Sequence, residues 1–125
     1  LPAKQAKFGS DNEPMGVYQG CKHWVYQRHT WKDPEDGFDY RLALRRSASL
    51  PPSLFIAGAH DRFLGHPNDV RRFMEEIGHP DSQFRLLSRK NGDRLDYDHV
   101  QMCTAPQALD DHFPEIYDWL QRHHT

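Results

Sequence analysis

Two short apolar segments on either side of an amphipathic one place the strongest constraint on how this chain folds. Residues 53–58, SLFIAG, and residues 83–88, QFRLLS, have the length and apolar content of buried strands. Residues 67–78 between them carry apolar side chains at helical spacing. A strand, a helix and a strand in this order predict two parallel strands joined by a right-handed crossover. The sequence therefore predicts an α/β fold in its second half.

Capping residues and prolines set the expected ends of the helices. Asn68 or Asp69 is the expected N-cap of the helix at 67–78, and Gly78 is its expected end. The tail, residues 105–124, predicts a helix that Pro114 kinks or splits, because proline lacks an N–H and clashes with the preceding turn.

The first half of the chain is less regular. Residues 13–31 predict an amphipathic helix that begins near Pro14, and residues 1–13 predict a loop or a frayed helix end. The apolar face of this helix would contain Val17, Cys21, Trp24, Val25 and Arg28. Residues 38–52 favour no single structure.

Two strands do not make a stable parallel sheet by themselves, because both faces need cover and both edges stay open. We therefore divide the chain into a helix and linker at 1–50 and an incomplete α/β segment at 51–125. Open edges of this kind predict a homo-oligomer, or pairing with a missing N-terminal half.

Charge and hydropathy narrow the classes of partner. The formal net charge is −2 with acids and bases interspersed, so we expect no nucleic-acid partner. No apolar run is long enough to span a bilayer, and no signal peptide is visible, so we expect a cytoplasmic protein without stable membrane insertion. Cys21 and Cys103 suit a reducing compartment, although a single bridge between them remains an alternative.

An aspartate and a histidine follow the two predicted strands. Asp61 lies just past the first strand and His99 lies in the loop past the second. Ligands of open parallel sheets bind at the carboxyl ends of the strands, so these two loops should meet there. A carboxylate beside an imidazole fixes its tautomer and stabilises the imidazolium formed during proton transfer. Asp61 and His99 are therefore our candidate catalytic residues.

The order of these motifs resembles the C-terminal part of an α/β-hydrolase. PPSLFIAGAHDRFLGHPNDVRRFMEEIG, FRLLS, DYDHVQM and IYDWL follow one another as in that family, most closely its acid-lipase and esterase branch. The resemblance implies the last two parallel strands with flanking helices. It also implies Asp61 as the triad acid, His99 as the general base, and no cofactor. In this branch an acidic or polar residue follows the histidine by two positions; Gln101 stands there in this sequence and is a mild departure.

The segment GCKHWVYQ, residues 20–27, is similar to the last helix of the cap that covers the substrate in such lipases. The resemblance therefore implies part of a helical cap, with Trp24 as a substrate-binding residue.

The nucleophile elbow of the family, G-x-S-x-G, does not occur in this sequence. In the family the serine precedes the acid and the base, so the resemblance implies an elbow upstream of residue 1. The chain would then be the C-terminal segment of a serine hydrolase acting on small-molecule carboxylic esters, with lipid esters as one candidate class. Alone it would be inactive, and the alternative is a self-associating fragment or binding module without activity.

Each candidate site residue also has a less specific interpretation. Asp61 could simply cap a turn, His99 could be an ordinary loop histidine, and Cys103 is expected to be a buried thiol rather than a nucleophile. No metal-binding motif is present, although His99 and Cys103 could share a helical face, and we expect no metal site. His60 and His66 flank Asp61 and could line a pocket, and Asp96 or Asp98 could tune His99 electrostatically. For all four we favour the interpretation as solvated loop residues.

Overall fold

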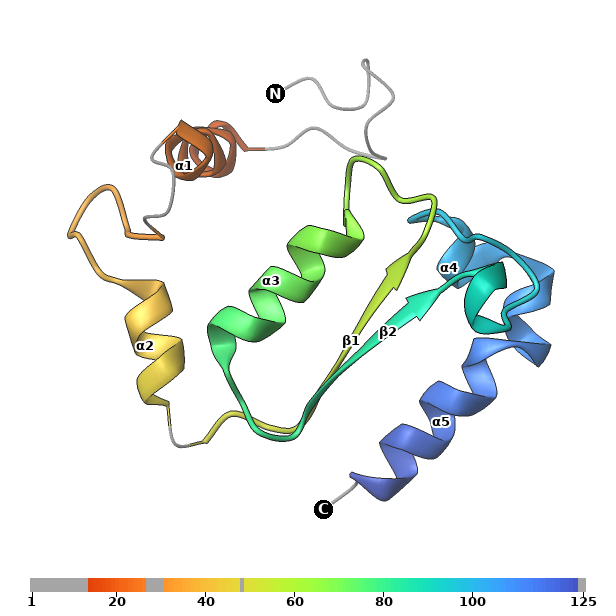
Figure 1. The fold of residues 1–125 in the computed structure, drawn as a ribbon. Helices are drawn as coiled ribbons and strands as arrows, with labels where there is room; N and C mark the ends of the chain where they lie inside the picture. The colour runs from red at the N-terminus through yellow and green to blue at the C-terminus, as the bar shows by residue number, and fades with distance from the viewer. Residues whose placement is uncertain (1–13, 27–30, 48, 124–125) are drawn as a thin grey trace. The chain divides into compact units, whose positions relative to one another are not determined.

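The computed structural model describes residues 14–26, 31–47 and 49–123, which fall into two compact units. The first unit ends at Ser47 and the second begins at Ala48 (Figure 1). Within these residues, no helix has both the length and the apolar character needed to cross a membrane.

The second unit contains the predicted strand, helix and strand. β1 (Ser53–Gly58) and α3 (Pro67–Ile77) lie where the sequence predicts them, and β2 (Ser82–Leu87) begins one residue early. The unit continues with η1 (Arg89–Asn91), α4 (Gln101–Thr104), η2 (Pro106–Asp110) and α5 (His112–Arg122). This part of the chain is therefore a mixed α/β structure with a parallel sheet of two strands.

The two strands pair in parallel with Phe55 opposite Phe84 and Gly58 opposite Leu87. Side chains alternate between the faces of a strand, so Phe55 and Phe84 share the face that α3 covers. The Phe55 ring meets Phe73 of α3 edge to face, with 6.0 Å between centroids, and the Arg71 guanidinium lies 4.1 Å above the Phe84 ring. These contacts fix the crossover helix on one face of the sheet.

The opposite face holds the small hydrophobic core, and α4 and α5 lie on this side (Figure 1). Leu87, Tyr97 and Ala108 are fully buried there. Partly buried apolar side chains surround them: Ile56, Leu95, Met102, Ala105 and Phe113. The sheet is thus covered on both faces, as a parallel sheet requires.

The N-cap of α3 differs from the prediction. His66, not Asn68 or Asp69, is the N-cap, and its Nδ1 accepts the Asn68 N–H at 3.2 Å. Pro67 then occupies the first helical turn, where its missing N–H costs nothing. Gly78 ends the helix in the left-handed conformation, as predicted.

The helical tail is split, but not by Pro114. The break falls at Asp111, between η2 and α5, and Pro114 lies in the first turn of α5 without kinking it. The prediction that Pro114 itself breaks the helix is therefore wrong, because proline in a first turn has no hydrogen bond to remove.

Aromatic contacts, rather than a buried core, hold the first unit together. Neither α1 (Met15–Tyr26) nor α2 (Tyr40–Arg46) contains a buried residue. The Trp24 ring contacts Trp31 and Tyr40, with 6.3 and 5.9 Å between centroids. The prediction that a helix begins near Pro14 is confirmed.

The remaining expectations concern the segment 38–52, the N-terminal residues and the two cysteines. The ambiguous segment 38–52 contains α2, which begins because the Asp39 side chain accepts the Leu42 N–H at 2.9 Å. Arg28 and residues 1–13 lie outside the described residues. Both cysteines are free and exposed, so the expected burial of Cys103 is wrong; its neighbour Met102 packs against the core instead.

Arg85 ties the loop after β2 to α5. Its Nη2 donates to Asp93 Oδ1 at 2.6 Å, and its Nε donates to Glu115 Oε2 at 2.9 Å. The Asp93 carboxylate is buried and also accepts the Ser88 N–H at 2.6 Å. A buried carboxylate depends on such partners, because the loss of water costs it several kcal/mol.

Replacing Arg85 with Met should therefore lower the free energy of unfolding by about 3 kcal/mol, because Asp93 keeps its burial and loses its cation. Urea unfolding followed by circular dichroism measures the loss. The matched control is Arg94→Met, which breaks an exposed pair with Asp110 at 3.6 Å and should cost less than about 1 kcal/mol. Equal losses in the two variants would contradict this account of Asp93.

Candidate active site

The end of β1 places Asp61 at the edge of the sheet. The chain leaves the strand at Gly58 and turns, with the Asp61 N–H donating to the Gly58 carbonyl at 3.0 Å. The carboxylate turns inward, and Asp61 is only 3% exposed. An aspartate this buried needs partners for its charge.

The following loop supplies most of those partners. Asp61 Oδ1 accepts the Leu64 N–H at 3.0 Å and the Phe63 N–H at 3.4 Å, and the Gly65 N–H also donates to the carboxylate. Three successive amides thus surround one side chain. Such a concave run of N–H groups favours an anion.

His99 approaches the carboxylate from the loop after β2. Its Nδ1 lies 2.7 Å from Asp61 Oδ2, and its side chain is 48% exposed. An ionised carboxylate only accepts hydrogen bonds, so the proton of the contact lies on Nδ1. Nε2 has no hydrogen-bond partner within the described residues, and in the neutral imidazole it carries the lone pair. The structure therefore brings the two candidate residues into direct contact.

The charge state of Asp61 follows from these contacts. Burial by itself would raise the pKa of the Asp61 carboxyl. Hydrogen bonds from the Gly65 amide, from His99 and from the two other loop amides outweigh burial, so the pKa lies below its usual value. Asp61 is consequently an ionised acceptor that orients His99 and would stabilise its protonated form.

Close approach of two backbone segments sets the position of the His99 loop. The His60 N–H donates to the Tyr97 carbonyl at 2.9 Å, and this draws the loop over the end of β1. A Cβ on Gly58 would lie 2.8 Å from the Tyr97 carbonyl carbon and 3.3 Å from the Asp98 oxygen. Only glycine leaves room for the loop at this point.

Tyr97 holds the same loop against the hydrophobic core. Its ring is fully buried, and its hydroxyl donates to Asp111 Oδ2 at 2.8 Å. Burial, followed by the hydrogen bond to Asp111, raises the pKa of Tyr97 to about 12, so the phenol stays protonated. A rigid donor two residues before His99 limits the movement of the imidazole.

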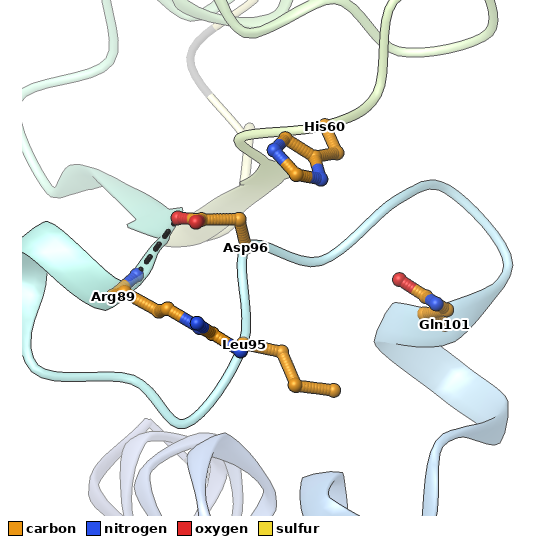
Figure 2. Close-up of a pocket in the computed structure, with 5 residues that line it drawn as sticks. All are labelled: His60, Arg89, Leu95, Asp96 and Gln101. Carbon is orange, nitrogen blue, oxygen red and sulfur yellow. Dashed lines mark hydrogen bonds between the residues drawn. The ribbon is translucent and has the colours of Figure 1, made fainter.

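The other loop residues named from the sequence have mainly structural contacts. His60 lines a cavity of about 280 Å³ together with Arg89, Leu95, Asp96 and Gln101 (Figure 2). In Figure 2 the Arg89 N–H donates to Asp96 Oδ1, at 2.9 Å. His66 caps α3 instead of lining this cavity. No hydrogen bond joins Asp61 to the side chain of His60, His66, Asp96 or Asp98.

Asp98 shapes the turn that carries His99. Its Oδ1 accepts the Val100 N–H at 2.9 Å and the Gln101 N–H at 2.8 Å, while Gln101 Oε1 accepts the Asp98 N–H at 3.2 Å. Gln101, which departs from the hydrolase pattern, therefore serves the backbone of this turn.

Trp24 lies in the first unit, where it lines a cavity with Asp33 and Tyr40. The described residues contain no group of three or more His, Cys, Asp or Glu side chains that could hold a metal ion.

Sequence reasoning missed Gly65 as part of the site. A Cβ at this position would lie 2.9 Å from Asp61 Oδ2 and 3.3 Å from His99 Nδ1. Gly65 is not among the glycines with positive φ, so space rather than backbone conformation requires a glycine here. Its place four residues after Asp61 is the only trace of this role in the sequence.

Comparison with known proteins gives no relative: no family model, curated protein or solved structure matches this chain.

Gly65→Ala should separate Asp61 from His99, because the added methyl group lies too close to both side chains. We expect the imidazole ¹⁵N chemical shifts to move from a single Nδ1–H tautomer towards a mixture of tautomers. NMR of ¹⁵N-histidine-labelled protein measures this. Gly20→Ala is the control, since a Cβ there meets nothing within 4 Å. Unchanged His99 shifts in Gly65→Ala would refute the steric argument.

Stability should depend on pH through Asp61. Its pKa is lowered on folding from the usual 3.8, so its stabilisation is complete above that pH and is lost as pH falls through the folded-state value. Asp61→Asn should therefore cost about 2 kcal/mol at pH 7, and the difference from wild type should shrink at pH 3. Urea unfolding at a series of pH values tests this; a difference that stays constant or grows in acid would contradict it.

Proposed function

We propose that this chain is the C-terminal segment of an α/β-hydrolase that acts on carboxylic esters, with Asp61 as the triad acid and His99 as the general base. The observation that carries the proposal is the 2.7 Å contact between His99 Nδ1 and a buried Asp61 carboxylate, with Nε2 free. The order strand, acid, helix, strand, base and helix agrees with the resemblance in the sequence.

The geometry suits proton transfer at Nε2. A serine hydroxyl placed at Nε2 would give its proton to that nitrogen as its oxygen attacks the ester carbonyl. The imidazolium so formed would be stabilised by the ionised Asp61, which does not itself take the proton. His99 would then donate the proton to the leaving alcohol oxygen, and a water molecule would complete hydrolysis by the same route.

This chain would contribute only part of the catalytic machinery. In the proposal, the nucleophile and the oxyanion-hole amides come from sequence before residue 1, as the family order implies. Oxyanion stabilisation is often the largest single contribution to such catalysis. The 125-residue chain alone should therefore be inactive.

A second candidate function is self-association without catalysis. Within the described residues, β1 has β2 as its only strand neighbour, so its other edge is open. Open edges favour pairing with another strand, either of a second copy or of a preceding segment. An oligomer that shows no ester turnover in the full-length protein would favour this function.

The catalytic proposal is tested on the full-length protein with a chromogenic short-chain ester. His99→Ala should lower kcat/KM at least a thousandfold, because the serine loses its base. The matched control is His79→Ala, which removes a half-buried histidine from the turn before β2, where its Nδ1 accepts the Asp81 N–H, and should change kcat/KM less than about twofold.

Two results would contradict the proposal. One is ester turnover that persists in His99→Ala. The other is labelling of the isolated 125-residue chain by a fluorophosphonate, detected by intact mass, because the reactive nucleophile would then lie within residues 1–125.

A further inference from the structure

A cavity of about 410 Å³ lies within the first unit, between α1 and the segment that leads into α2. The rings of Trp24 and Tyr40 and the carboxylates of Asp33 and Glu35 are among its lining groups. Aromatic faces and negative charge occur together here. The contacts of each group indicate what the cavity can hold.

Both aromatic rings are fixed by their polar atoms. Trp24 Nε1 donates to the Lys32 carbonyl at 2.7 Å, and the Tyr40 hydroxyl donates to Asp33 Oδ2 at 2.6 Å. The two rings meet at 77°, so they form walls in two nearly perpendicular planes. Tyr40 also contacts Trp31 and Phe38, with 5.8 and 5.1 Å between centroids, so it belongs to a cluster of rings at the edge of the cavity. The negative face of an aromatic ring attracts cations.

The charged side chains among the described lining residues are Asp33 and Glu35, and both are acidic. The neighbouring Lys32 is paired with Asp39 at 3.9 Å. The hydrogen bond from Tyr40, followed by the Glu35 N–H, lowers the pKa of Asp33, so this carboxylate is ionised at neutral pH. The turn also holds it in place, because Asp33 Oδ1 accepts the Glu35 N–H at 2.9 Å.

Two glycines of α1 border the cavity with open space where a side chain would begin. Gly16 and Gly20 both line it, and a Cβ on either would meet nothing within 4 Å. Neither glycine has a positive φ, so the backbone does not require glycine at these positions. Glycine in a helix interior is destabilising relative to alanine, so the free space comes at the expense of helix stability.

We propose that this cavity binds an organic ammonium ion, with its alkyl groups against the Trp24 and Tyr40 rings and its charge facing Asp33. An ammonium ion with apolar substituents is weakly hydrated, so it gains from ring faces what a small, strongly hydrated cation does not. A bare metal ion fits poorly, because the described residues hold no group of three or more His, Cys, Asp or Glu side chains that could ligate it. This site uses residues of the first unit alone and does not depend on the proposed ester hydrolysis.

The proposal is tested by titrating the full 125-residue chain with choline and with 3,3-dimethylbutan-1-ol, which has nearly the same shape and no charge. Tryptophan fluorescence follows binding, and isothermal titration calorimetry gives the affinity. We expect saturable choline binding in the millimolar range or tighter, and at least tenfold weaker binding of the alcohol. Equal binding of the two compounds, or no saturable choline binding, would overturn the proposal.

Variants then locate the site. Asp33→Asn should weaken choline binding at least fivefold, whereas Asp36→Asn should change it less than twofold, because Asp36 belongs to the same turn and does not line the cavity. Equal losses would indicate general electrostatic attraction and would overturn the site.

Gly20→Leu provides a second test that does not disturb the turn. Leucine favours the helix more than glycine does, and its side chain would fill the free space, so choline binding should be lost while helicity is kept. Gly20→Leu protein that is helical by circular dichroism and still binds choline with wild-type affinity would overturn the proposal.

Discussion

The in-register parallel pairing of β1 with β2 is the constraint on which the candidate active site depends. Parallel strands end at the same edge of a sheet, so the loops that follow Gly58 and Leu87 start from paired positions. Asp61 comes from the first loop and His99 from the second. A shift of register would carry these loops apart and would also turn side chains from the core face towards α3. The contact between Asp61 and His99 is therefore a consequence of sheet geometry.

Backbone clearance and hydrogen bonding then bring the two side chains from neighbouring loops into contact. Gly58 lets the His99 loop cross the end of β1, and Gly65 leaves room beside the Asp61 carboxylate. Tyr97, buried and bonded to Asp111, fixes the loop from the core side. The contact between Asp61 and His99 thus depends on the absence of side chains at Gly58 and Gly65.

The two units are stabilised in different ways, and this difference bears on what each can bind. The second unit buries Leu87, Tyr97 and Ala108, and it neutralises the buried Asp93 with Arg85. The described part of the first unit has no buried residue in its helices and relies on rings that contact one another at the surface. Aromatic rings left partly exposed and held by hydrogen bonds are available to a ligand, which a filled core is not.

The sequence by itself determined the strand, helix and strand, the end of α3 at Gly78 and the choice of Asp61 and His99, because local periodicity and turn residues encode these features. It did not determine that His66 caps α3, that the tail breaks at Asp111, or that Cys103 faces solvent. The His66 cap is a hydrogen bond to Asn68, and Cys103 faces solvent because its neighbour Met102 packs against the core. Only the tertiary structure decided the roles of Gly65 and Tyr97 and the cavity beside Trp24, because they arise from distances between segments that are separated in the chain. Local pattern fixes which residues a loop carries, and long-range packing fixes what they touch.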